Sequence, residues 1–208
     1  LLQSQARLDL AEARAHAEAA GAPGGVAELL RRGDLLEALA ERESAAALLV
    51  LGKRGEAADF AKLHLGSNLE RILRASRVPV LVAARAFRPI SRFALAFDGR
   101  PSALKAVDDI SRSPLFAGLA GSLVTAGERT EAAEAALEAA ARQLRGGGIE
   151  VETRFAPGSP NAAIPEEVAR TGADLLVMGA YGHSRLRTLV LGSTTSEMIR
   201  ACRVPILV

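Results

Sequence analysis

The chain has 208 residues, of which 49% are hydrophobic, so it can bury one or two cores. Its 26 basic and 24 acidic residues leave a net charge of +2, and only 3% are aromatic, which argues against a nucleic-acid-binding surface. The single cysteine, Cys202, excludes an intrachain disulfide, and with no signal peptide and no membrane span expected, the sequence indicates a cytoplasmic protein.

Helices and strands are predicted to alternate along the first half of the chain. Helices are expected over residues 1–20, from Asp34 to about Ser44, and from the capping box Ser67-x-x-Glu70 to about Ser76. Short strands are expected over residues 26–30, 46–51 and 78–82. Residues 83–89 read as a linker, so we expect one domain over residues 1–87 and a second over residues 88–208.

The second half alternates more regularly. Strands are expected over residues 92–97, 122–125, 149–155, 174–178 and 204–208. Helices are expected over residues 102–110, 128–145 and 161–171, and after the capping box Thr194-x-x-Glu197. This alternation predicts an α/β fold with a mostly parallel sheet.

A glycine motif follows a buried strand in each half. In the second half it reads Gly179-x2-Gly182-x9-Gly192-Ser193, and in the first half Gly52-x2-Gly55-x10-Gly66-Ser67. A Val-Pro strand follows each motif, at Val78-Pro79 and Val204-Pro205, so the chain is a tandem of one module. The first half has no counterpart of residues 90–127. We therefore expect its domain to be incomplete in this sequence, without its first two strands.

A ligand-binding site is expected beyond the carboxyl ends of the strands, at the point where the winding of the parallel sheet reverses direction. Asp98 ends the first strand of the second half and can accept hydrogen bonds from ribose or adenine. Gly179 ends the fourth strand and lets backbone N–H groups approach a phosphate, while Ser193 and Thr194 lie at a helix start that favours an anion. Each feature has a structural alternative, namely a turn at Asp98 or Gly179 and a helix cap at Ser193 or Thr194. The combination favours a nucleotide.

The second half resembles the nucleotide-binding members of the universal stress protein family. The residues that carry the resemblance are Asp98, Gly179-Ala180-Tyr181-Gly182, Gly192-Ser193 and the closing Val204-Pro205-Ile206-Leu207-Val208. The resemblance implies two Rossmann-like domains of the adenine nucleotide alpha hydrolase type, with strand order 3-2-1-4-5. It also implies ATP as ligand, together with any Mg²⁺ that ATP carries, and a regulatory role in the stress response.

The resemblance further implies which residues contact the nucleotide. Base and ribose contacts are expected near Ala96, Asp98 and Val124. Ribose and phosphate contacts are expected from Met178, Gly179, Gly182, Gly192, Ser193 and Thr194. The final strands, residues 78–82 and 204–208, are expected to pair within the chain as a pseudo-dimer, and a homodimer is the further alternative.

The first half departs from this pattern. Its spacer has ten residues, Lys53-Arg54 fills the first gap, and no equivalent of Asp98 is present in the sequence. A second anion site is a candidate there, at Gly52, Gly55, Gly66 and Ser67. The alternative is a degenerate repeat retained for structure.

No enzyme motif is recognised. Gly52-Lys53 is not followed by Ser or Thr, so it is no Walker A motif, and Gly146-Gly147-Gly148 follows a helix instead of a strand. We predict no catalytic residue and no protein metal site, with slow ATP hydrolysis at most. In the favoured interpretation, a nucleotide orders residues 180–192 and so changes a surface that an unknown partner protein recognises. The competing interpretation is a module that binds proteins and no nucleotide. A third is an enzyme of the wider adenine-nucleotide α/β group, either an ATPase or a nucleotidyl transferase.

Overall fold

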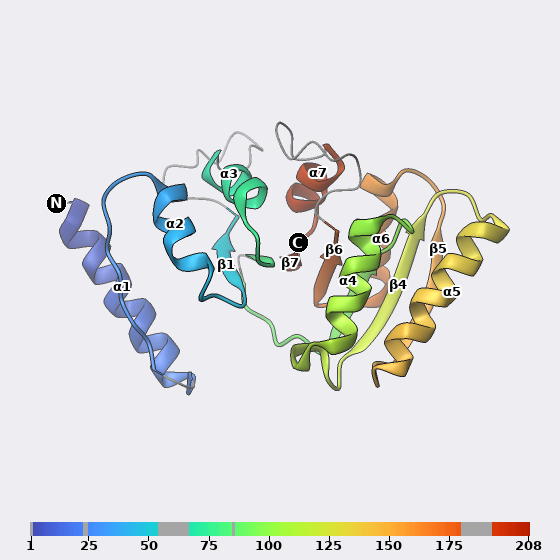
Figure 1. Cartoon of the computed structure of the whole chain (residues 1–208), viewed down its shortest axis with the longest axis horizontal. Coiled ribbons are helices and arrows are strands. Elements are labelled where there is room, and N and C mark those ends of the chain that lie inside the picture. Colours follow the sequence, from blue (N-terminus) through green and yellow to red (C-terminus); the bar gives the residue numbers. More distant parts are fainter. Residues whose placement is uncertain (1, 23–24, 54–66, 85, 180–192) are drawn as a thin grey trace. The chain divides into compact units, whose positions relative to one another are not determined.

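The computed structural model describes residues 2–22, 25–53, 67–84, 86–179 and 193–208 (Figure 1). The chain divides into two compact units, residues 1–42 and 43–208. The smaller unit contains α1 (Leu2–Ala19) and most of α2 (Leu35–Glu43). The Asp34 carboxylate caps α2 as predicted, because its Oδ1 accepts hydrogen bonds from the N–H groups of Leu36 (2.8 Å) and Glu37 (3.3 Å).

The strand predicted over residues 26–30 is wrong. These residues form neither a helix nor a strand, and Leu29 and Leu30 are exposed. A strand is stable only when its backbone groups pair with a neighbour. Within the described part of its unit, this segment has no neighbouring strand to pair with. Its apolar residues alone are therefore not sufficient to form a strand.

The larger unit is built on one sheet of seven strands in the order β1-β2-β7-β6-β3-β4-β5. The strands are β1 (Leu49–Gly52), β2 (Val80–Ala83), β3 (Arg92–Ala96), β4 (Ala120–Ala126), β5 (Val151–Ala156), β6 (Leu175–Met178) and β7 (Ile206–Leu207). All neighbours are parallel except β2 and β7. The strands of the second half therefore have the order 3-2-1-4-5, which confirms the predicted α/β fold.

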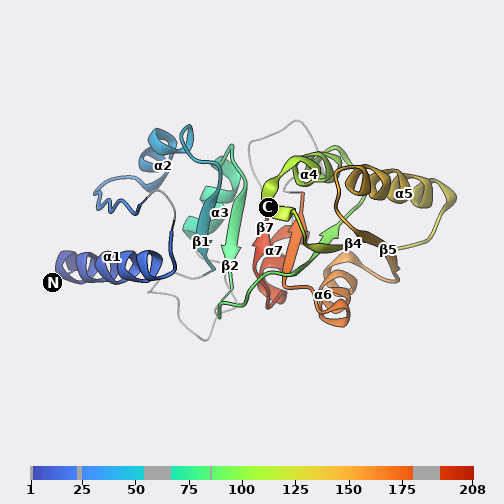
Figure 2. The same ribbon diagram turned by 90° about the horizontal axis from the view of Figure 1, so that it is seen from below.

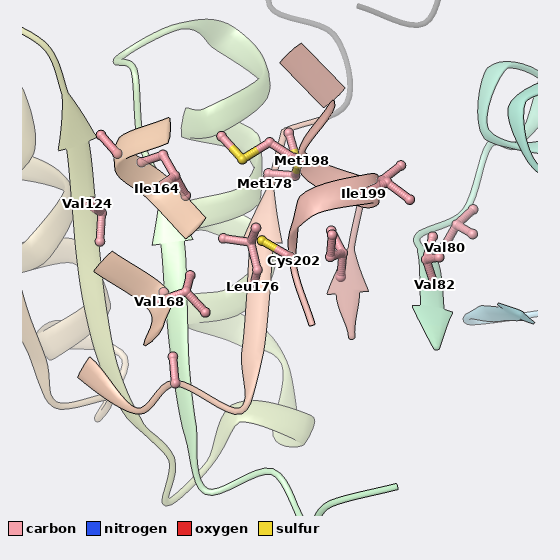
Figure 3. Close-up of a cluster of buried hydrophobic side chains, with 14 of the residues drawn as sticks. Val80, Val82, Val124, Ile164, Val168, Leu176, Met178, Met198, Ile199 and Cys202 are labelled. Atoms are coloured by element: carbon pink, nitrogen blue, oxygen red, sulfur yellow. The ribbon is translucent and has the colours of Figure 1, made fainter. Parts of the chain in front are cut away.

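Helices cover both faces of this sheet (Figure 2). They are α3 (Ser67–Ala75), α4 (Pro101–Arg112), α5 (Glu131–Gly146), α6 (Pro160–Thr171) and α7 (Ser193–Ala201), with a 3₁₀ turn at Pro114–Phe116. Side chains alternate along β3, so Phe93 packs with residues of α4 and α5, whereas Ala94 packs with residues of α6 and α7. Figure 3 shows the core that contains Ala94, to which α7 contributes Met198 and Ile199 and β6 contributes Leu176.

Helix starts differ from the predictions by one to three residues. The helix predicted from Ser102 begins at Pro101, because proline is favoured at the first helical position. The helix predicted from residue 128 begins at Glu131, since the Thr130 hydroxyl caps it by accepting a hydrogen bond from the Ala133 N–H (3.2 Å). Thr194 lies inside α7 and is not its N-cap.

The final strands of the two repeats pair with each other, as predicted. β2 and β7 are antiparallel, with Leu81 opposite Leu207 and Val82 opposite Ile206. The N–H groups of Val80 and Val208 each donate to the other residue's carbonyl oxygen at 2.9 Å. Because both Val82 and Ile206 are fully buried, the two repeats share one core across this junction.

A buried carboxylate fixes the connection between α3 and β2. Glu43 is 7% exposed, and its Oε1 accepts hydrogen bonds from the Ser76 hydroxyl (2.7 Å), the Arg77 N–H and the Val78 N–H (3.3 Å). Burial acts to raise the pKa of the Glu43 carboxyl, but these hydrogen bonds together outweigh burial and leave the pKa below its ordinary value of 4.5.

We expect Glu43→Gln to lower the free energy of unfolding by about 1 kcal/mol at neutral pH, because an amide oxygen accepts these bonds more weakly than a carboxylate does. The folded-state pKa is depressed, so the extra stability of the native chain is present above the ordinary pKa and is lost as pH falls through the folded value. Urea unfolding of both proteins at neutral pH and near pH 3 measures this difference. A difference that stays constant with pH would contradict the assignment.

Candidate functional site

Three of the predicted contact residues form one row across the middle of the sheet. Ala96 of β3 is in register with Val124 of β4 and with Met178 of β6. Since residues in register face the same side, all three side chains lie on the face that α6 and α7 cover, where Val124 and Met178 are buried (Figure 3). The row ends β3 and β6, and its side chains belong to the core next to the carboxyl ends of these strands.

Asp98 lies two residues beyond β3, in the turn that enters α4. Its Oδ1 accepts a hydrogen bond from the Arg100 N–H (3.0 Å), its Oδ2 lies 3.7 Å from the Arg100 Nε, and Gly99 supplies a φ of +71°. The Asp98 side chain is 49% exposed. It therefore holds the turn and still presents carboxylate surface to solvent, where a ligand can reach it.

Gly179 follows β6 directly and packs against the first turn of α4. A Cβ at this position would lie 2.7 Å from both the Cβ and the Oγ of Ser102, and 2.8 Å from the Ser102 carbonyl carbon. Only glycine fits this approach without displacing the backbone. Gly179 thus has a packing role, beside the phosphate role predicted for it.

Sequence reasoning missed Ser102 as a site residue and treated it only as a helix start. Its side chain packs against Gly179, the residue that follows β6, and Ser102 is in the first turn of α4, four residues after Asp98. The signal that could have found it is its position four residues after Asp98, since the first turn of a helix after a central strand borders the crevice.

The helices that begin at the carboxyl ends of the strands differ in whether acidic or capping side chains neutralise the positive, N-terminal end of the helix dipole. The first turns of α4 and α7 contain no acidic residue, and no side chain caps α4. By contrast, α5 starts with the Thr130 cap and with Glu131 and Glu134 in its first turn. The first turn of α6 contains no acidic residue either, but α6 follows the edge strand β5. Among these described helices, α4 and α7 are therefore the two that begin beside the central strands β3 and β6 with an end that favours an anion.

Some predicted residues cannot be placed in this arrangement. Gly182 and Gly192 lie outside the described residues, as do Gly55 and Gly66 of the first repeat. Ser193 and Ser67 open α7 and α3, and Gly52 ends β1 opposite Ala83. Thr194 is half-buried in the first turn of α7.

The cysteine thiol is not activated. Burial raises the pKa of the Cys202 thiol to about 11, although the nearby Lys53 ammonium opposes this, so the thiol is protonated at neutral pH. In the part of the chain that the structure describes, no group of three His, Cys, Asp or Glu side chains is arranged to hold a metal. No described helix is both long enough and apolar enough to cross a bilayer.

Comparison with known proteins gives one family throughout. The family model of the universal stress proteins matches residues 1–84 and 82–208. A universal stress protein of Synechocystis is 36% identical over 209 aligned residues, which cover the whole of this chain and 72% of that protein.

Solved structures of universal stress proteins are similar to this chain as well. A universal stress protein of Archaeoglobus fulgidus superimposes with a TM-score of 0.77 at 26% identity, covering 99% of this chain and 76% of its own. A universal stress protein solved in complex with cAMP matches with a TM-score of 0.50 at 26% identity, covering 58% of this chain and 97% of its own. Both comparisons support the α/β architecture of the sheet.

Proposed function

This chain belongs to the universal stress protein family, with two tandem family segments, and on that premise we propose that its second half binds an adenine nucleotide. The site would lie between Asp98 and residues 179–194. The observation that carries the proposal is that α4 and α7, whose first turns contain no acidic residue, begin beside the adjacent strands β3 and β6, where the sheet reverses its winding.

The described residues fit the parts of a nucleotide. The exposed Asp98 carboxylate supplies an acceptor for ribose hydroxyls or the adenine amino group. Val124 and Met178 are buried and Ala96 is half-buried, so this row would border the base from within the core. The first turn of α7, with Thr194 and its neighbouring hydroxyl residues, would hold the phosphates. Gly182, Gly192 and Ser193 join this set as predictions.

We propose ATP as the nucleotide, together with the Mg²⁺ that ATP carries. The relative solved with cAMP supports an adenosine phosphate in general, since both ligands contain adenine, ribose and phosphate. Because no catalytic group is predicted, we propose a regulatory role in the stress response, in which the bound nucleotide changes a surface that a partner protein recognises.

The cytoplasmic location, the homodimer and the domain boundary near residue 87 stay predictions.

Titration calorimetry with ATP and with cAMP tests this proposal, preceded by mass spectrometry of small molecules released on denaturation of the purified protein. We expect release of an adenine nucleotide, or a dissociation constant for ATP of about micromolar or below, with a stoichiometry near one. A stoichiometry near two would support the second candidate site at Gly52, Gly55, Gly66 and Ser67.

The competing interpretation is a protein-interaction module that binds no nucleotide. Two observations favour it, because Gly179 is needed for packing against Ser102 and Asp98 holds the turn before α4. If no nucleotide is released and no heat appears up to about millimolar ATP, where binding is worth only about 4 kcal/mol, the nucleotide proposal is wrong.

A further inference from the structure

A hollow of about 620 Å³ lies beside the edge strand β5, and it shares no residue with the candidate nucleotide site. It lies between α5 and β5. Its lining includes Glu131, Glu134 and Glu138 on one face of α5, Thr153 and Phe155 on β5, and Arg129 from the loop before α5.

β5 is an edge strand, and part of its edge is open. Among the described strands it pairs only with β4. The carbonyl oxygens of Glu150 and Ala156 accept hydrogen bonds from the β4 side, at Gly121 and Gly127. Because backbone groups alternate along a strand, those of Val151, Thr153 and Phe155 point outward.

One of these outward groups is already covered. The Arg145 guanidinium donates to the Val151 carbonyl oxygen at 2.8 Å from its Nη2. The outward N–H and C=O groups of Thr153 and Phe155 bond to no other backbone group of the described chain, and these two residues border the hollow. The open stretch of the edge and the hollow therefore form one continuous surface.

The charges in the hollow select for a cation. Arg129 lies over the Phe155 ring, 5.5 Å from its centroid, and pairs with Glu134. Glu138 accepts a hydrogen bond from the Thr153 hydroxyl (2.8 Å) and lies 3.6 Å from Arg145, whereas Glu131 makes no ion pair within the described residues. The three carboxylates are thus set against two guanidiniums, Arg129 in the lining and Arg145 beside it, which leaves one net negative charge next to an aromatic ring that already packs against a cation.

We propose that this surface docks an extended segment of a partner protein that carries lysine or arginine at the position facing α5. The segment adds a strand to β5 through the backbone groups of Thr153 and Phe155. Its basic side chain enters the hollow, with its aliphatic stem against Phe155 and its charge near Glu131.

A second copy of this chain fits the surface less well. Two β5 strands pairing antiparallel would be related by a two-fold axis perpendicular to the sheet, so both α5 helices would lie on the same face. The two sets of glutamates would then lie side by side, and like charges brought together at an interface oppose binding. The charges therefore favour a basic partner over self-association.

Fluorescence anisotropy with a labelled peptide of about nine residues, alternating Thr and Lys, tests the proposal on the full chain. We expect saturable binding, and at least about tenfold weaker binding of a Thr and Glu peptide. Thr153→Pro removes an outward N–H, together with the hydroxyl bond to Glu138, without changing charge or a bond to β4. Glu131→Lys reverses a charge in the hollow and leaves that bond in place. Each is expected to weaken binding of the basic peptide by about tenfold or more.

Glu12→Lys, on the exposed surface of α1, makes the same charge change elsewhere and is expected to bind like the native chain. Glu131 is an exposed helix position, so Glu131→Lys still tests the idea if the proline variant does not fold. Equal binding by Glu131→Lys and Glu12→Lys, or no saturation up to about 1 mM peptide, would overturn the proposal. So would a dimer in sedimentation that Thr153→Pro abolishes, since a second copy would then cover the edge.

Discussion

Gly179→Ala is expected to lower the free energy of unfolding by about 1–3 kcal/mol, because the added Cβ overpacks the contact between β6 and α4. The new carbon would lie 2.7 Å from the Ser102 side chain and 2.8 Å from its backbone carbonyl carbon. The backbone contact cannot be relieved by a rotamer change, so the start of α4 must move. Urea unfolding monitored by circular dichroism measures the loss.

Gly146→Ala is the matched control for this substitution. Gly146 ends α5, and a Cβ there would meet nothing within 4 Å. Its stability is expected to stay within about 0.5 kcal/mol of the native chain or to rise slightly, because alanine reduces the entropy of the unfolded chain. The double variant Gly179→Ala with Ser102→Gly should recover part of the loss. If Gly179→Ala is as stable as Gly146→Ala, β6 and α4 are not packed as described.

Asp98→Asn is expected to weaken ATP binding by about 1–3 kcal/mol, or roughly tenfold to a hundredfold, through loss of a charge-assisted hydrogen bond. Asparagine keeps the Oδ1 acceptor that holds the Arg100 N–H, so the turn before α4 is retained. Titration calorimetry measures the affinity, and thermal unfolding without nucleotide checks the turn.

Two further variants separate the roles of this carboxylate. Asp98→Ala also removes the turn contact, so it should lose both affinity and some stability. Asp109→Asn neutralises an exposed carboxylate on the helix that follows this turn, one that pairs with Lys105, and should bind ATP like the native chain. Unchanged affinity in Asp98→Asn would restrict Asp98 to the structural role of the turn.

The second half of the chain shows how much of the secondary structure local sequence patterns can predict. Its strands and helices were predicted in the right order, because each has its own period and a Gly, Pro or capping residue at its boundary. The register that aligns Ala96, Val124 and Met178 was not contained in any local pattern. It follows from how neighbouring strands pair, and so does the absence of a strand at residues 26–30, where an apolar segment has no neighbour in the described part of its unit.

Residue type and spacing along the chain were enough to predict the tandem glycine motif and the α/β class. The resemblance that this motif carries indicated the family, and it alone implied the full set of candidate nucleotide residues. The folded chain was needed to find that Gly179 meets Ser102 and that Asp98 also holds a turn. It was needed as well to find that α4 and α7 begin without acidic residues while α5 does not, and that the open edge of β5 borders an acidic hollow. The turn at Asp98 and the helix starts depend on local backbone geometry. The contact of Gly179 with Ser102 and the hollow between α5 and β5 depend on distances between segments that are remote in sequence, and only the packing of helices on the sheet sets such distances.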